Sequence, residues 1–118
     1  MGRAYHLTGD LKNAESVYYQ TIAQDPNHTL AFAQLGVLAF ADERLTQALS
    51  SFRRSINSYP YNPVVWNNYG HALLFSDSTN AALAAYTMAI SLDPDYANAF
   101  NNRGELLLYK QTELSKGK

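Results

Sequence analysis

The sequence predicts an all-α fold, an α-solenoid in which antiparallel helix pairs stack one on the next. The first observation is a set of four glycines spaced 34 residues apart, at Gly2, Gly36, Gly70 and Gly104. The second is that other residue types keep the same period: Pro26, Pro60 and Pro94; Ala14, Ala48 and Ala82; Tyr18, Phe52 and Tyr86; Ile22, Ile56 and Ile90. A fixed period of this kind is typical of repeat proteins, in which each unit buries its apolar face against its neighbours.

The residues 29–62 form one complete period. Apolar residues at helical spacing predict a first helix over 31–40, with Asn27 or Thr29 as its N-cap. A polar break at 42–44 separates it from a second amphipathic stripe made of Leu45, Ala48, Leu49, Phe52 and Ile56. Pro60 and Pro63 then end this helix and begin the next, because proline suits only the first turn of a helix.

The residues 63–96 repeat this arrangement, with the break at 76–78. The two ends are incomplete: residues 1–28 form a partial repeat, and residues 97–118 form a terminal or capping helix with a polar tail. Lys116 stands where the small alanine of a further second helix is expected. We therefore expect the chain to be a segment of a longer solenoid.

Small residues indicate how the two helices of one repeat approach each other. Gly36 is expected to face Ala48, and Gly70 to face Ala82, because antiparallel helices joined by a short turn must cross closely. The aromatic residue of each second helix, such as Phe52, is expected to fill the groove between one repeat and the next.

Composition limits the functions that are open to the chain. Nine basic and ten acidic residues give a formal charge of −1, and there is no basic cluster for nucleic acid or an anionic membrane. The absence of cysteine excludes disulfides and thiolate metal sites. No run of apolar residues is long enough to span a membrane.

The residue types at these spacings resemble the tetratricopeptide repeat family. In the period from Pro63 the matching residues are Trp66, Gly70, Ala82, Tyr86, Ala89 and Pro94. The resemblance covers essentially the whole chain, with Ser55 and Thr21 standing where alanine is usual. It implies a right-handed solenoid whose first helices line a concave groove for a peptide or helix of a partner.

The resemblance places particular residues in that groove. The partner-binding positions that we expect are Gln34, Val37, Asn67, Asn68, His71, Asn101, Asn102 and Glu105. Asn68 and Asn102 are 34 residues apart and resemble the asparagine ladder in the repeat arm of protein O-glycosyltransferases. A side-chain amide both donates and accepts, so it suits a peptide backbone of any sequence. The alternative is that these asparagines bond water or a neighbouring helix.

Catalysis finds no support in the sequence. His6, His28 and His71 are far apart and lack metal-binding spacing, and there is no nucleophile or phosphate-loop motif. We therefore predict no enzyme activity, no cofactor and no metal. A groove with so few cations is also not expected to bind an acidic chaperone tail.

Three functions follow from this interpretation. The leading one is a protein–protein interaction scaffold that holds a peptide or helix of a partner protein, in the cytoplasm, without nucleic acid or membrane as partner. The second is a structural solenoid segment packed in a large multiprotein assembly. The third is the repeat arm of a larger enzyme, such as a protein O-glycosyltransferase.

Overall fold

The computed structural model describes residues 9–116 of the chain, so Gly2 and His6 lie outside the described residues. Every regular element within 9–116 is a helix. The six helices are α1 (Gly9–Gln24), α2 (Thr29–Ala41), α3 (Leu45–Ser58), α4 (Pro63–Phe75), α5 (Thr79–Leu92) and α6 (Ala97–Lys116). They fall into two compact units that divide between Tyr61 and Asn62. We call them the N-terminal unit (α1–α3) and the C-terminal unit (α4–α6).

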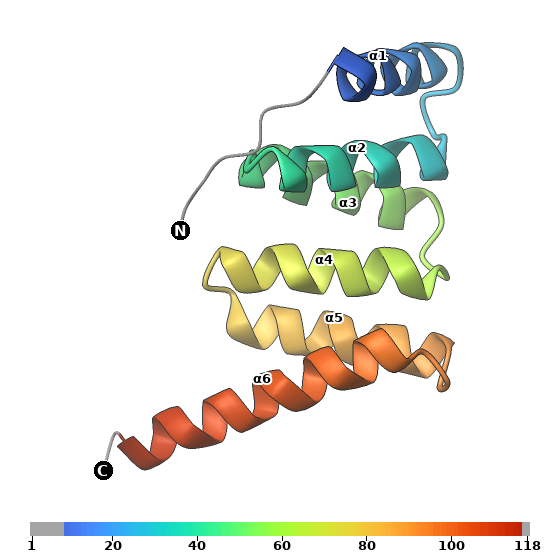
Figure 1. Cartoon of the computed structure of the whole chain (residues 1–118). Helices are drawn as coiled ribbons and strands as arrows, with labels where there is room; N and C mark the ends of the chain where they lie inside the picture. Colours follow the sequence, from blue (N-terminus) through green and yellow to red (C-terminus); the bar gives the residue numbers. More distant parts are fainter. Residues whose placement is uncertain (1–8, 117–118) are drawn as a thin grey trace. The chain divides into compact units, whose positions relative to one another are not determined.

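In the N-terminal unit, α2 and α3 form an antiparallel hairpin, and α1 lies against α2 (Figure 1). The core of the hairpin consists of apolar side chains from the facing sides of its two helices: Phe32, Leu35, Leu38, Ala39, Ala48, Phe52 and Ile56. Ser55 is also fully buried, and its hydroxyl donates to the carbonyl of Thr29 at 2.9 Å. That bond explains how a polar residue is accommodated where the family usually has alanine.

The starts of the helices depend on side chains that accept from free backbone N–H groups. The N-cap of α2 is His28, whose Nδ1 accepts from the N–H of Ala31 at 3.1 Å. The expectation that Asn27 or Thr29 would cap this helix was therefore wrong, because an imidazole nitrogen supplies the acceptor instead. Asn62 caps α4 and accepts from the N–H of Val64, ahead of Pro63 in the first turn.

The polar breaks predicted at 42–44 and 76–78 are the turns of the two hairpins. In each turn the middle residue has a positive φ, 60° at Glu43 and 61° at Asp77. L-residues adopt this left-handed conformation at a cost, since Cβ approaches the following carbonyl. This conformation lets the chain reverse within the three residues that separate the two helices of each hairpin.

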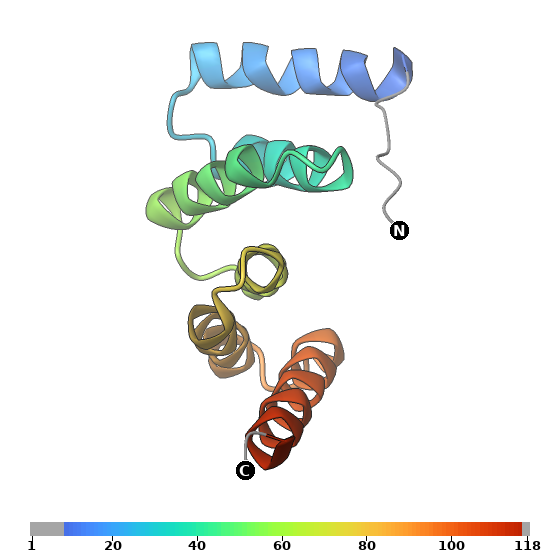
Figure 2. The same cartoon turned by 90° about the vertical axis from the view of Figure 1, so that its left-hand side faces the viewer.

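In the C-terminal unit, α4 and α5 form the second hairpin and α6 packs against α5 (Figure 2). The fully buried residues Ala82, Tyr86 and Ala89 form one stripe of α5, and Ala99 and Leu106 of α6 are buried as well. Helix α6 has 20 residues, against 13 in α2 and in α4. It continues straight through 110–112, the positions where the other first helices turn back.

The two repeat glycines make room for aromatic rings. A Cβ on Gly36 would lie 2.6 Å from Cε1 of Phe52, and one on Gly70 would lie 2.8 Å from Cε1 of Tyr86. Gly70 also approaches the backbone oxygen of Ala82, at 3.2 Å from that Cβ position, as the small-residue crossing predicts. We expected these aromatic rings to fill the groove between one repeat and the next. That expectation was incomplete, because each ring also packs on the glycine of its own hairpin.

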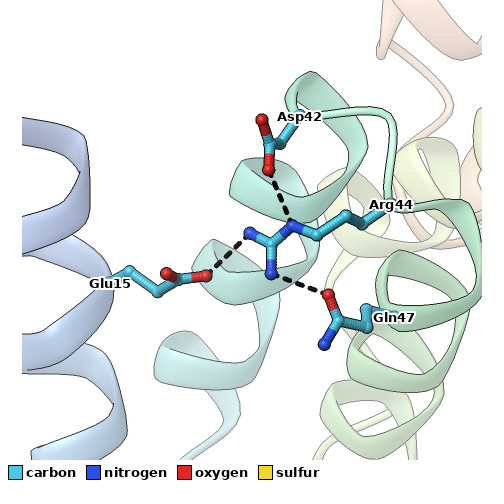
Figure 3. Close-up of polar contacts among 4 residues, drawn as sticks. All are labelled: Glu15, Asp42, Arg44 and Gln47. Carbon is cyan, nitrogen blue, oxygen red and sulfur yellow. Dashed lines mark hydrogen bonds and ion pairs between the residues drawn. The ribbon is translucent and has the colours of Figure 1, made fainter. Parts of the chain in front are cut away.

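An arginine at the turn ties α1 to the α2–α3 hairpin (Figure 3). One terminal nitrogen of Arg44 donates to Glu15 Oε2 at 2.7 Å, and the other donates to Gln47 Oε1 at 2.7 Å. Arg44 Nε lies 2.9 Å from Asp42 Oδ2, an ion pair without the alignment of a hydrogen bond. The hydrogen bond to Glu15 is the main cause that raises the pKa of Arg44 above its ordinary value.

Candidate functional site

Six of the eight predicted binding residues lie on α4 and α6 of the C-terminal unit. We call the surface that they form the α4–α6 face; its residues are Asn67, Asn68, His71, Leu74 and Phe75 of α4, and Asn101, Asn102, Glu105, Leu108 and Tyr109 of α6. Both helices run in the same direction within this unit (Figure 1). Residues three or four apart on each helix therefore form successive layers across the face.

The first layer is a pair of bonded amides. Asn102 Nδ2 donates to Asn67 Oδ1 at 3.0 Å, joining α6 directly to α4. Asn67 is only 6% exposed, so this bond also satisfies a buried polar group. The bond spans 35 residues, one more than the 34-residue spacing from which Asn68 and Asn102 were predicted to form a ladder. Asn68 is half-buried and Asn101 is exposed beside this pair.

The second layer contains His71 and Glu105, one helical turn further along. The hydroxyl of Tyr86, from the underlying helix α5, lies 3.5 Å from His71 Nδ1. Burial raises the pKa of the Tyr86 hydroxyl, and the negative charge of Glu105 raises it further. The side chain of Glu105 is exposed and that of His71 is half-buried. This layer therefore presents a carboxylate to solvent above a buried, protonated phenol.

The third layer is apolar and open to solvent. In both views α6 runs away from α4 toward its C-terminal end (Figures 1 and 2). Phe75, the last residue of α4, is 65% exposed, and Leu108, in the C-terminal half of α6, is 66% exposed. Tyr109 is exposed as well. The face therefore changes from amides, through one carboxylate, to large apolar side chains.

The other two predicted residues lie on α2 of the N-terminal unit. Gln34 is half-buried and Val37 is 40% exposed. The structure therefore brings six of the predicted residues together on one face and leaves these two on a separate helix.

Sequence reasoning missed the role of Tyr86. Its place in the 34-residue aromatic series marked it as a core residue, but not as the source of a hydroxyl beneath His71. The corresponding residue of the other hairpin, Phe52, has no hydroxyl. The available signal was that position 86 of this series holds tyrosine, whose hydroxyl needs a polar neighbour when it is buried.

No helix within 9–116 is long and apolar enough to cross a bilayer. Among the same residues, no three histidine, aspartate or glutamate side chains gather as a metal ion would require.

Comparison with known proteins identifies the class. The family model described as "Tetratricopeptide repeat" matches residues 1–63, and the one described as "TPR repeat" matches residues 77–111. Solved structures share the fold: the O-GlcNAc transferase of Thermobaculum terrenum has a TM-score of 0.79 over 84% of this chain and 19% of that chain, at 23% identity. MamA has a TM-score of 0.78 over 91% of this chain and 67% of its own, at 22% identity. The predicted all-α solenoid of helix pairs is thus confirmed as the fold class.

The chain belongs to the tetratricopeptide repeat family. Among its curated relatives, the peroxisomal targeting signal receptor of Candida albicans is 31% identical over 59% of this chain and 12% of that protein. The Arabidopsis thaliana CTR9 homolog is 29% identical over 95% of this chain and 11% of that protein. The chain spans only about an eighth of these relatives. Membership of this family supports a protein-interaction scaffold.

Proposed function

We propose that the chain is a peptide-binding module whose α4–α6 face holds an extended segment of a partner protein. The observation that carries this proposal is a pair of accessible amides, the half-buried Asn68 of α4 and the exposed Asn101 of α6. The Asn102–Asn67 hydrogen bond joins the two helices beside them. That bond uses one N–H of Asn102 and the oxygen of the buried Asn67, so Asn68 and Asn101 are the two amides of this group that it does not engage. Each offers one acceptor and two donors to a peptide backbone.

Two similar proteins support this class of ligand. YrrB, with a TM-score of 0.71 and 24% identity over 79% of this chain, is described as having an unusual peptide-binding site. The receptor of Candida albicans named above binds, by its name, a peroxisomal targeting signal. For a single face of this size we expect binding of about −8 kcal/mol, a dissociation constant near 1 µM.

The test is a display selection of random octapeptides on the immobilised full chain, followed by calorimetric titration of the recovered peptides. The variant Asn68→Ala with Asn101→Ala is expected to weaken binding about tenfold, because two hydrogen bonds of about 0.5–1.5 kcal/mol each are lost. The control is Asn13→Ala with Asn57→Ala, two exposed asparagines on α1 and α3. Equal loss in both double variants, or recovery of no binding peptide, contradicts the proposal.

A further inference from the structure

The chemistry of the second and third layers indicates what kind of peptide the α4–α6 face accepts. This inference rests on the proposed function, since it concerns the sequence preference of the same face. We infer that the face selects an extended segment in which a lysine or arginine lies two residues from a large apolar residue, with the cation at Glu105 and the apolar side chain against Leu108 and Phe75.

Charge complementarity supports the cation. Among the residues of the α4–α6 face, Glu105 is the one carboxylate, and the face carries no lysine or arginine. Arg103, the nearest basic residue on α6, has its guanidinium 5.7 Å from the centre of the Phe100 ring, on another side of the helix. A cationic ligand side chain thus meets an exposed carboxylate without a competing arginine from the face.

The apolar side chain is supported by what the fold leaves uncovered. Among the residues 62–113, Leu108 and Phe75 are the two most exposed large apolar residues, at 66% and 65%. Phe75 is the last residue of α4, and Leu108 belongs to the C-terminal half of α6, the half that runs away from α4 (Figure 1). Covering such side chains removes apolar surface from water and favours binding. At the other end of the face, the Asn102–Asn67 hydrogen bond joins α6 to α4.

The spacing follows from the geometry of the helix and of the ligand. Glu105 and Leu108 are three residues apart on α6, so they differ by about 4.5 Å along the helix axis, and their Cβ atoms lie roughly 5–6 Å apart. An extended peptide rises about 3.3 Å per residue and places alternate side chains on one side, roughly 6.6 Å apart. A cation and an apolar residue two positions apart therefore match the two layers. A helical ligand would need a spacing of three or four.

The experiment measures the affinity of the full chain for capped octapeptides by fluorescence anisotropy. The reference peptide carries lysine and leucine two residues apart in a glycine–serine background. Three further peptides change lysine to glutamine, change leucine to serine, or place lysine and leucine four residues apart. We expect the lysine-to-glutamine change to weaken binding about two- to fivefold, and less at high salt. The leucine-to-serine change should cost about three- to tenfold.

Protein variants locate each preference. Glu105→Gln should abolish the advantage of lysine over glutamine, whereas Asp95→Asn, an exposed carboxylate on the loop before α6, should preserve it. Leu108→Ser should abolish the advantage of leucine over serine. Leu107→Ser, at an exposed leucine on another side of α6, should preserve it. These positions are on the surface, and circular dichroism verifies that each variant folds.

The outcomes separate this inference from the proposed function. If the neutral peptide binds and is weakened by the Asn68→Ala, Asn101→Ala variant, but lysine gives no advantage, the preference is wrong and the binding face stands. A lysine preference that survives Glu105→Gln overturns the assignment of the cation site. Tighter binding of the peptide with four-residue spacing overturns the extended geometry. If no octapeptide binds, both the preference and the proposed function are rejected.

Discussion

Gly36 shows how a single missing side chain determines the packing of a hairpin. The ring of Phe52 occupies the space that a Cβ on Gly36 would need, at 2.6 Å. Phe52 is 1% exposed, so its ring cannot turn outward without opening the core. We expect Gly36→Ala to lower the free energy of unfolding by about 1–3 kcal/mol, the cost of overpacking a filled core.

The matched control is another glycine of the same 34-residue series. A Cβ on Gly104 would meet nothing within 4 Å, and this residue is exposed within α6. Gly104→Ala is therefore expected to raise the free energy of unfolding by about 0.5–1 kcal/mol, because alanine loses less backbone entropy in a helix. Urea titration of both variants measures the two effects. Effects of the same sign would contradict the packing of the Phe52 ring on Gly36.

The hairpin turns lead to a second prediction. Glu43 has φ 60°, where an L-residue costs about 1–2 kcal/mol. Glycine removes that cost but loses more chain entropy, about 0.5–1 kcal/mol. Glu43→Gly should therefore stabilise the protein by about 0.5–1 kcal/mol. Thermal melts test it beside Ser50→Gly, an exposed site inside α3, which should destabilise by about 0.5 kcal/mol.

At this scale the sequence predicted residue types better than residue partners. The 34-residue period identified Gly36 and Phe52 as structural positions, yet the contact between them depends on side-chain directions that a period does not contain. In the same way, the pattern located the start of α2 within a residue or two but assigned its cap to Asn27 or Thr29. Several polar side chains near a helix start compete, and the backbone conformation at His28 decided the outcome.

At the scale of elements, the ion pair between Arg44 and Glu15 links α1 to the hairpin that follows it. Its guanidinium and the Glu15 carboxylate are 31% and 20% exposed, so the pair is partly screened from water. We expect a double-mutant cycle of Arg44→Met and Glu15→Gln to give a coupling energy of about 0.5–1.5 kcal/mol. Unfolding in urea supplies the four free energies.

The control cycle pairs Arg44→Met with Asp10→Asn, an exposed carboxylate elsewhere on α1, and should give a coupling near zero. Hydrogen exchange supplies an independent measurement, since loss of the link should speed exchange of the α1 amides more than those of α3. If the two cycles give equal coupling, the link has no specific role. The sequence did not predict this contact, because the two residues are 29 positions apart and belong to different periods.

Element boundaries were the part of the fold that the sequence predicted best. Polar breaks at 42–44 and 76–78 and the prolines at 60 and 63 marked the ends of α2 to α5 closely. Helix α6 differs, because it continues past the position where the period suggests a turn. Gln111 is the middle residue of the corresponding segment 110–112 in α6. The middle residues of the two hairpin turns are Glu43 and Asp77, which adopt the left-handed conformation. Side-chain type alone does not distinguish these three sites.

At the scale of the whole molecule, a repeat period predicted the fold class and the kind of function but not the ligand. The period determines which residues lie in the core, and the family resemblance predicts which helices present a binding surface. The proposed preference for a cation next to an apolar residue depends instead on Glu105, which stands where the earlier first helices have Val37 and His71. Such a substitution becomes interpretable only when the separation of α4 and α6 is known. The predicted cytoplasmic location and absence of enzyme activity stay predictions.

Global stability at high pH tests the environment beneath the binding face. Burial and the charge of Glu105 raise the pKa of Tyr86 in the folded chain above the ordinary value of about 10. Below that pH the hydroxyl is protonated in both states, so it adds no pH dependence. Above it the unfolded chain releases its proton first and binds fewer protons than the folded chain. The free energy of unfolding must therefore fall as the pH rises above about 10.

Replacing the phenol separates this contribution from that of the other tyrosines. We expect Tyr86→Phe to make the free energy of unfolding fall less steeply above about pH 10, because the residue no longer titrates in either state. Tyr109→Phe removes an exposed phenol from α6 and should leave the slope close to that of the parent. Urea titrations at a series of pH values measure the slopes. Equal slopes in the two variants would mean that the Tyr86 hydroxyl is as well solvated in the folded chain as in the unfolded one, and that the buried phenol under His71 and Glu105 does not exist in solution.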